Sequence, residues 1–141
     1  MTSWATHTPV AGGSLDLPRA SANGSHEAAP DDAIWAERID ELLGIRQLED
    51  DWDGQGTPAP PTEVVDGALI LALLLRREGI AAPNGVTQGM AGGVHFDWQP
   101  ADGRYIELQV TAPRTAVVYV HTPGAATKRY TIADRPAGVT A

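Results

Sequence analysis

The chain of 141 residues has no cysteine, and all of its serines lie near the start of the sequence, at Ser3, Ser14, Ser21 and Ser25. The first absence excludes disulfides, thiolate metal sites and cysteine nucleophiles. The second leaves no serine for a Ser–His–Asp site in the rest of the chain. The glycines between residues 85 and 93 have no Walker lysine beside them, so a phosphate-cradling loop is missing too. Catalysis by these routes is therefore not expected.

Long hydrophobic runs are also scarce. The longest, Ala68 to Leu75, has eight residues, whereas a membrane-spanning helix needs about 20. Residues 1–13 lack the basic leader and continuous apolar core of a signal peptide. Hydrophobic residues make up 43% of the chain, which is enough to bury a core. We expect a soluble cytoplasmic protein with one domain and no membrane contact.

Basic residues are scarce in one part of the chain. Between Glu27 and Asp53 there are ten acidic residues and two basic ones, a net charge of −8, while the remaining eight acidic and eight basic residues cancel. Direct nucleic-acid binding by this segment is disfavoured, because phosphate contacts need Lys and Arg. An acidic segment can steer a basic partner. The alternative interpretation is a solvated helix face that serves solubility.

Three regions are distinguished by composition. Residues 1–29 are rich in Ala, Ser, Thr, Gly and Pro and show little apolar periodicity, which predicts a flexible N-terminal tail. Residues 30–133 carry the periodic patterns of a single domain, and residues 134–141 are expected to fray. The domain is where any function is to be sought.

Two helices are predicted in the first half of the domain. The first begins after Pro30, where Asp31 or Asp32 can cap it. Its apolar face is formed by residues at helical spacing: Trp35, Ile39, Leu42 and Leu43. Thr62 can cap the second helix, which runs to about Glu78 and is apolar on almost every side. Such a helix is typical of a core element.

After residue 93 the hydrophobic period changes to two. Val94, Phe96 and Trp98 alternate with His95 and Asp97. The same alternation recurs over residues 105–111 and 117–121, with a fourth candidate strand over 128–132. The predicted fold is α+β, with two N-terminal helices packed on a three- or four-stranded antiparallel β-meander.

The helices are joined by a corner with the sequence Asp51-Trp52-Asp53-Gly54-Gln55-Gly56, followed by three prolines. Glu49, Asp51 and Asp53 have the spacing of a half calcium loop, but the closing position, which needs a bidentate Glu, is Pro60. We therefore expect Asp53 to accept backbone N–H groups in the turn, with Trp52 filling the gap between helices and sheet. A structural role is assigned to Gly54, Gly56, Pro58 and Trp98.

The corner and the strand that follows carry a resemblance. Their shared pattern consists of Trp52, Asp53, Gly54, Gly56, Pro58, Gly92, Gly93 and Trp98. It resembles a family of small uncharacterised bacterial proteins that have a Trp-Asp-Gly-x-Gly corner between two helices and a C-terminal β-meander. The resemblance covers roughly residues 35–121. It implies the same fold and a bacterial origin, and it implies no activity.

The favoured function is non-catalytic: a small binding or adaptor protein, such as an inhibitor or antidote subunit of a bacterial complex. No cofactor is expected, and homo-oligomer formation stays open. The partner would be a protein with a basic surface, contacted by acidic and aromatic residues of the helix and the corner: Glu37, Asp40, Glu41, Asp50, Asp51, Trp52 and Asp53.

Two other functions remain open. If His95, Asp97 and His121 converge on the exposed sheet face, two imidazoles and a carboxylate could hold a metal ion or support acid–base chemistry. The carboxylates of the acidic segment could alternatively mimic nucleic acid and block a DNA-binding protein. Metal content would test the first, and release of the partner by duplex DNA would test the second.

Overall fold

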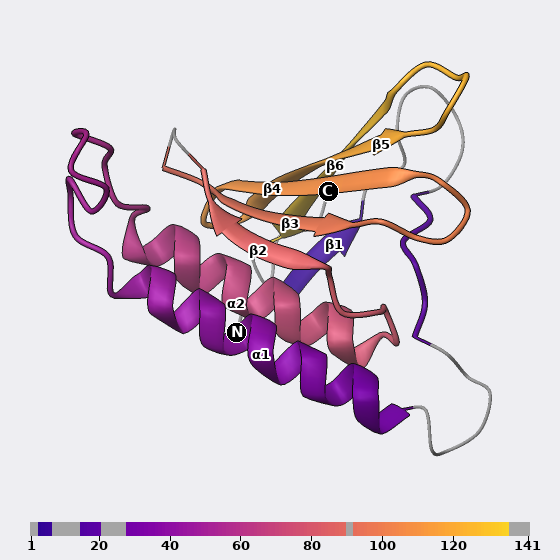
Figure 1. The fold of residues 1–141 in the computed structure, drawn as a ribbon, viewed down its shortest axis with the longest axis horizontal. Helices are drawn as coiled ribbons and strands as arrows, with labels where there is room; N and C mark the ends of the chain where they lie inside the picture. Colours follow the sequence, from indigo (N-terminus) through magenta and orange to yellow (C-terminus); the bar gives the residue numbers. More distant parts are fainter. Residues whose placement is uncertain (1–2, 7–14, 21–27, 90–91, 136–141) are drawn as a thin grey trace.

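The fold consists of two helices and one six-stranded antiparallel sheet (Figure 1). It was obtained as a computed structural model that describes residues 3–6, 15–20, 28–89 and 92–135. The order of strands across the sheet is β1-β6-β5-β4-β3-β2. Along the chain the elements are β1 (Ser3–Thr6), α1 (Ala28–Arg46), α2 (Thr62–Arg77), β2 (Gly85–Gln88), β3 (Val94–Trp98), β4 (Tyr105–Ala112), β5 (Thr115–His121) and β6 (Lys128–Arg135).

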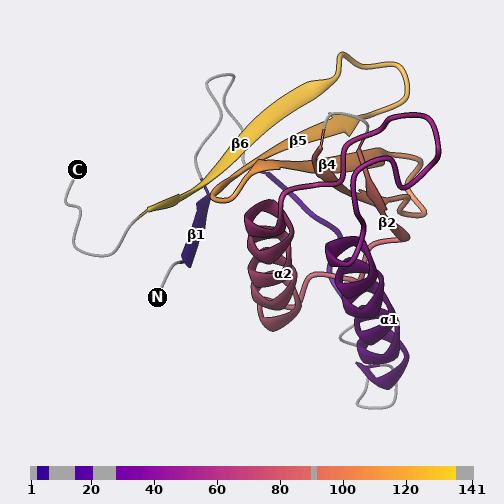
Figure 2. The same ribbon diagram turned by 90° about the vertical axis from the view of Figure 1, so that its left-hand side faces the viewer.

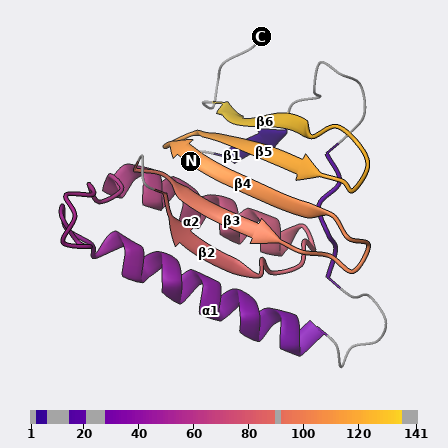
Figure 3. The same ribbon diagram turned by 45° about the horizontal axis from the view of Figure 1, so that its top comes forward.

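Both helices cover the same face of the sheet (Figure 2). α2 lies behind the middle strands, and α1 runs antiparallel to it beside the β2 edge (Figure 3). The opposite face, called here the outer face, has no described element over it. The α+β class with two helices on an antiparallel sheet is confirmed. The sheet is wider than predicted, because five strands follow the helices and β1 pairs with β6 as a sixth.

The core lies between the two helices and the inner face of the sheet. Burial in β3 and β5 alternates with a period of two, so every second side chain points inward. The buried side of α2 carries Val64, Val65, Ala68, Leu71, Ala72 and Leu75. The prediction that α2 is a core helix is confirmed. Two of its apolar side chains still face solvent: Ile70 is 38% exposed and Leu73 is 53% exposed. Leu43 of α1 is 45% exposed and is therefore not part of the buried face to which it was assigned.

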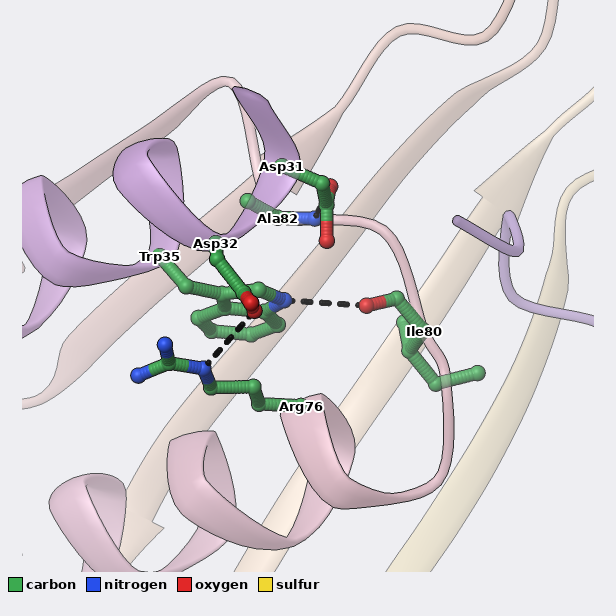
Figure 4. A network of polar contacts seen from close by, with 6 residues as sticks. All are labelled: Asp31, Asp32, Trp35, Arg76, Ile80 and Ala82. Carbon is green, nitrogen blue, oxygen red and sulfur yellow. Dashed lines mark hydrogen bonds and ion pairs between the residues drawn. The ribbon is translucent and has the colours of Figure 1, made fainter. Parts of the chain in front are cut away.

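Polar contacts fix the start of α1 against the end of α2 (Figure 4). The indole Nε1 of the fully buried Trp35 donates to the Ile80 carbonyl at 2.9 Å, and the Asp31 carboxylate accepts the Ala82 N–H at 3.0 Å. Asp32 forms an ion pair with Arg76 at 3.3 Å. The helix begins at Ala28 rather than after Pro30, which is allowed because proline fits the first helical turn. The two aspartates that were expected to cap α1 therefore connect its first turn to other segments. Asp31 contacts the loop after α2, and Asp32 contacts the last turn of α2.

Parts of the predicted N-terminal tail belong to the folded domain. Ala20 donates its N–H to the Gly79 carbonyl and Ala81 donates to the Pro18 carbonyl, at 2.8 and 2.9 Å. Leu17 is buried in the core cluster. The expectation of a flexible tail is therefore wrong for residues 15–20 and for β1, while residues 7–14 and 21–27 lie outside the described residues.

The C-terminal boundary also differs from the expectation. β6 continues to Arg135, so residues 134 and 135 are in a strand, and the rest of the segment expected to fray lies outside the described residues. Neither described helix is long and apolar enough to cross a membrane.

Candidate functional site

The corner between α1 and α2 is held by its own carboxylates. Asp53 accepts N–H groups from Gln55 at 2.9 Å and from Thr57 at 3.3 Å, and it also accepts the Thr57 hydroxyl. These bonds stabilise the ionised carboxylate, so the pKa of Asp53 lies below its usual value; the Thr57 hydroxyl is the main cause. The prediction that Asp53 closes the turn is confirmed.

Two further aspartates bond within the same loop. Asp51 accepts the Gly56 N–H at 2.6 Å and has a left-handed backbone with φ of 63°, while Asp50 accepts the Ala59 N–H at 3.0 Å. All three corner aspartates are exposed, yet each holds at least one backbone N–H of the loop. Asp50 and Asp51 each accept through one oxygen only, so these exposed carboxylates can accept further hydrogen bonds. The three aspartates therefore have a structural role in the loop, and their assignment to partner binding stays a prediction.

The two tryptophans assigned to this region have different surroundings. Trp52 is half-buried in the corner, and its indole Nε1 is buried with no hydrogen-bond partner in the described residues. Trp98 lies at the other end of α2, where its Nε1 donates to the Ala81 carbonyl at 2.8 Å. Trp98 is thus a core residue of the sheet and is not part of the corner that Gly54, Gly56 and Pro58 belong to.

The exposed side of α1 carries three carboxylates. Glu37, Asp40 and Glu41 are all exposed. Glu41 forms an ion pair with Arg38 at 2.8 Å, whereas Glu37 and Asp40 have no hydrogen bond or ion pair to any described residue. Because Glu37 and Asp40 are three positions apart, they lie on the same side of the helix. We call Glu37, Asp40 and Glu41 the acidic face of α1.

The outer face of the sheet carries an aromatic group beside two carboxylates. Tyr105 and His121 are directly opposite each other on β4 and β5, with ring centroids 5.8 Å apart. Tyr119 stacks on His121 at 6.5 Å. Asp97 and Glu107 are a cross-strand pair on the same face. The Tyr105 hydroxyl has a raised pKa, firstly through partial burial and then through the negative charges of Asp97 and Glu107.

The candidate metal site on this face does not form. His95 is opposite Gln109, and Gln109 is opposite Val117, which is four residues before His121 on β5. The two histidines are therefore separated by two strands, about 10 Å, and by about 13 Å along the strand direction. In the described part of the chain, no three His, Asp or Glu side chains are grouped to hold a metal ion. The hypothesis of a shared site for His95, Asp97 and His121 was wrong. The strand register, which the sequence does not give, places the two histidines far apart.

The sequence carries a signal for the outer face in the alternation of its predicted strands. Tyr105, Tyr119 and Glu107 occupy alternate positions of predicted strands, so their common face could be anticipated, but their neighbours could not. Only the register shows that Asp97 is opposite Glu107 and that Glu107 is opposite Tyr119. A one-residue shift of either strand would reverse the face of every side chain on it.

No family model matches the chain, and searches among curated proteins and solved structures also found no match. The resemblance to a bacterial family with a Trp-Asp-Gly-x-Gly corner therefore stays a prediction.

Proposed function

We propose that the chain is a non-catalytic protein-binding domain of the adaptor or inhibitor type, which engages a basic surface of a protein partner through the acidic face of α1. The observation that carries the proposal is the presence of exposed Glu37 and Asp40, without partners among the described residues, in the segment that holds the net charge. The carboxylates of the corner support the loop and are secondary.

Charges placed in this way have a defined physical role. Exposed carboxylates gain little from ion pairs within the chain, but they speed association with a basic surface and orient it. Leu43 is exposed and three positions after Asp40, so the same side of α1 offers an apolar contact beside the charges. A contact of this composition fits a reversible protein interface. We propose that this contact forms in the cytoplasm. The reducing conditions there do not affect a chain that has no cysteine and therefore no disulfide.

The proposal is tested by charge reversal on two helices. Immobilised wild-type chain, an Asp40→Lys/Glu41→Lys variant and a Glu63→Lys/Glu78→Lys control capture proteins from the native cell at low salt. The control makes the same change in net charge at Glu63 of α2 and at Glu78, which directly follows α2, and both residues are also exposed. We expect a stoichiometric partner with the wild type and the control and its loss with the α1 variant, while the three circular dichroism spectra agree.

Equal capture of the partner by the α1 variant and the wild type contradicts the proposal. Loss of the partner in the control as well as in the α1 variant would indicate a response to net charge alone, and it contradicts the proposal too.

A further inference from the structure

A second surface, on the outer face of the sheet, places two carboxylates beside aromatic rings. One row of side chains crosses this face through Asp97, Glu107, Tyr119 and Arg129, each opposite the next. Gly85 begins the row on β2, so the flank of Asp97 has no side chain over it; a Cβ there would be 3.0 Å from the Asp97 carboxylate. Asp97 and Glu107 are half-buried, and the glycine leaves the β2 side of the Asp97 carboxylate without a covering side chain.

The pair of carboxylates is unfavourable in the isolated chain. Like charges directly opposite on neighbouring strands destabilise a sheet, and their Cβ atoms are about 5 Å apart. None of the ion pairs in the described residues involves Asp97 or Glu107. Their hydrogen bonds are to neutral amides: Gln109 donates to Glu107 at 2.9 Å, and Gln99 is 3.5 Å from Asp97. Amide donors leave the negative charge uncompensated, so an external cation would relieve the repulsion.

Aromatic rings border the pair on two sides. Tyr105 is two residues before Glu107 on the same face of β4, and Tyr119 is opposite Glu107 on β5. His121 lies between the two tyrosines, and its Nδ1 is 2.9 Å from the Thr127 hydroxyl, which fixes the ring. A cation that reaches both carboxylates therefore also meets the face or edge of a tyrosine ring. This second feature, independent of the charges, favours an organic cation.

We propose that the outer face binds an arginine side chain of an extended basic segment in a protein partner, with the guanidinium bridging Asp97 and Glu107 beside Tyr105 and Tyr119. Arginine fits better than lysine, because its planar fork donates to two carboxylates and stacks on aromatic rings, whereas an ammonium is a strongly hydrated point charge. A metal ion fits worse, since the described residues supply no third ligand. The arginine seat, defined as Asp97, Glu107, Tyr105 and Tyr119, stands independently of the acidic face of α1.

The test is a titration of the ¹⁵N-labelled full chain, followed by amide chemical shifts. The probe is N-acetylarginine amide, compared with N-acetyllysine amide and with N-acetylcitrulline amide, which has nearly the same shape without the charge. We expect saturable shifts in β3, β4 and β5 with the arginine probe, at a dissociation constant on the order of 1 mM for a ligand of this size. The lysine probe should bind several-fold more weakly, and citrulline should not bind.

Conservative variants then separate the seat from the rest of the acidic surface. Glu107→Gln and Asp97→Asn should each weaken arginine binding by roughly tenfold, because each removes one charge-assisted contact. Both should fold normally, since they relieve a repulsion. Glu63→Gln, an exposed carboxylate on α2, is the matched control and should leave binding unchanged.

Several results would overturn the proposal. They are binding that survives in Glu107→Gln and Asp97→Asn, equal affinity for the arginine and lysine probes, and shifts that fall on α1 instead of the sheet. The absence of saturable shifts up to the solubility of the probe overturns it as well.

Discussion

At the scale of single residues, the carboxylates of this molecule divide according to what they bond. Asp50, Asp51 and Asp53 accept backbone N–H groups of the corner. Glu37 and Asp40 have no such partner in the described residues. All of these carboxylates are exposed, so exposure alone does not separate the residues that support the corner from those proposed to bind a partner. Their hydrogen bonds do differ: the corner carboxylates support a loop, whereas Glu37 and Asp40 of α1 bond to no described residue.

Asp53 should make the stability of the corner sensitive to acid. Its folded-state pKa is below the unfolded value, so its contribution is fully present above about pH 4 and is lost as pH falls through the folded pKa. We expect Asp53→Asn to lower the melting temperature at pH 7. As the pH is lowered below 5, the melting temperature of the variant should fall less than that of the wild type. Thermal melts across this range measure both effects.

Asp16→Asn is a suitable comparison for that experiment, because the Asp16 carboxylate has no hydrogen bond to a described residue. If the melting temperatures of Asp53→Asn and Asp16→Asn depend on pH in the same way, the Asp53 carboxylate does not stabilise the corner.

Tyr105 should make stability sensitive to alkali. Its folded pKa is raised, chiefly by burial and then by Asp97 and Glu107, so the folded state keeps its proton when the unfolded state has lost it. The stability from this group is present below about pH 10 and is lost as pH rises through the folded pKa. We expect Tyr105→Phe to lose less stability than the wild type between pH 9 and 11, as measured by urea denaturation.

A second variant identifies the cause of the Tyr105 shift. Glu107→Gln should lower the pKa of Tyr105 part of the way to its usual value, because one of the two nearby negative charges is removed. An unchanged tyrosine titration in Glu107→Gln would show that Glu107 does not act on Tyr105.

At the scale of elements, α2 lies closely against the β4–β5 turn at Gly67. A Cβ on Gly67 would be 2.3 Å from the Pro113 carbonyl oxygen, so only glycine lets the helix pack there. Gly67→Ala should destabilise the fold by about 1–3 kcal/mol despite the better helix propensity of alanine. Urea denaturation gives the difference in free energy of unfolding.

The same substitution in α1 supplies the control. Gly44 has no atom within 4 Å of a built Cβ, so Gly44→Ala should stabilise the protein by about 0.5–1 kcal/mol. Opposite signs for the two glycines are expected. A stabilising Gly67→Ala would mean that α2 is not packed this closely on the turn.

Elements with a long, regular hydrophobic pattern were predictable from the sequence. The apolar length of α2 and the alternation of Val94, Phe96 and Trp98 define a core helix and a half-buried strand whatever their neighbours. β1 and residues 15–20 were not predictable, because Leu15 and Leu17 are too few to form a pattern and are ordered by contacts with distant parts of the chain. The candidate metal site failed for a related reason, since the pairing of strands depends on register and not on the pattern within one strand.

At the scale of the whole molecule, the two candidate binding surfaces lie on different sides. The acidic face belongs to a helix that covers the inner face of the sheet, and the arginine seat lies on the outer face (Figure 2). One flat partner surface cannot be expected to contact both. An extended basic segment could occupy the sheet while a folded basic surface contacts α1, so the two contacts can be removed separately by mutation.

The N-terminal segment is a structural part of the whole molecule. Residues 15–20 lie beside a cleft of about 350 Å³ whose lining includes Leu17, Leu71 and Ile132. Leu17→Ala should therefore lower the free energy of unfolding by about 2 kcal/mol. This is the lower end of the range for a core leucine, because the side chain borders the cleft. Leu73→Ala on the exposed side of α2 is the control and should change stability by less than about 0.5 kcal/mol. Equal effects of the two substitutions would mean that residues 15–20 do not stabilise the domain.

The central claim, that α1 presents the partner-binding surface, is tested most directly by mapping the contact with the captured partner. The ¹⁵N-labelled chain is titrated with the purified partner at low and at moderate salt. We predict that the largest amide shifts fall on residues around Glu37, Asp40 and Glu41, and that affinity drops as salt screens the exposed charges. Shifts confined to residues outside α1, with an affinity that does not depend on salt, would contradict the account.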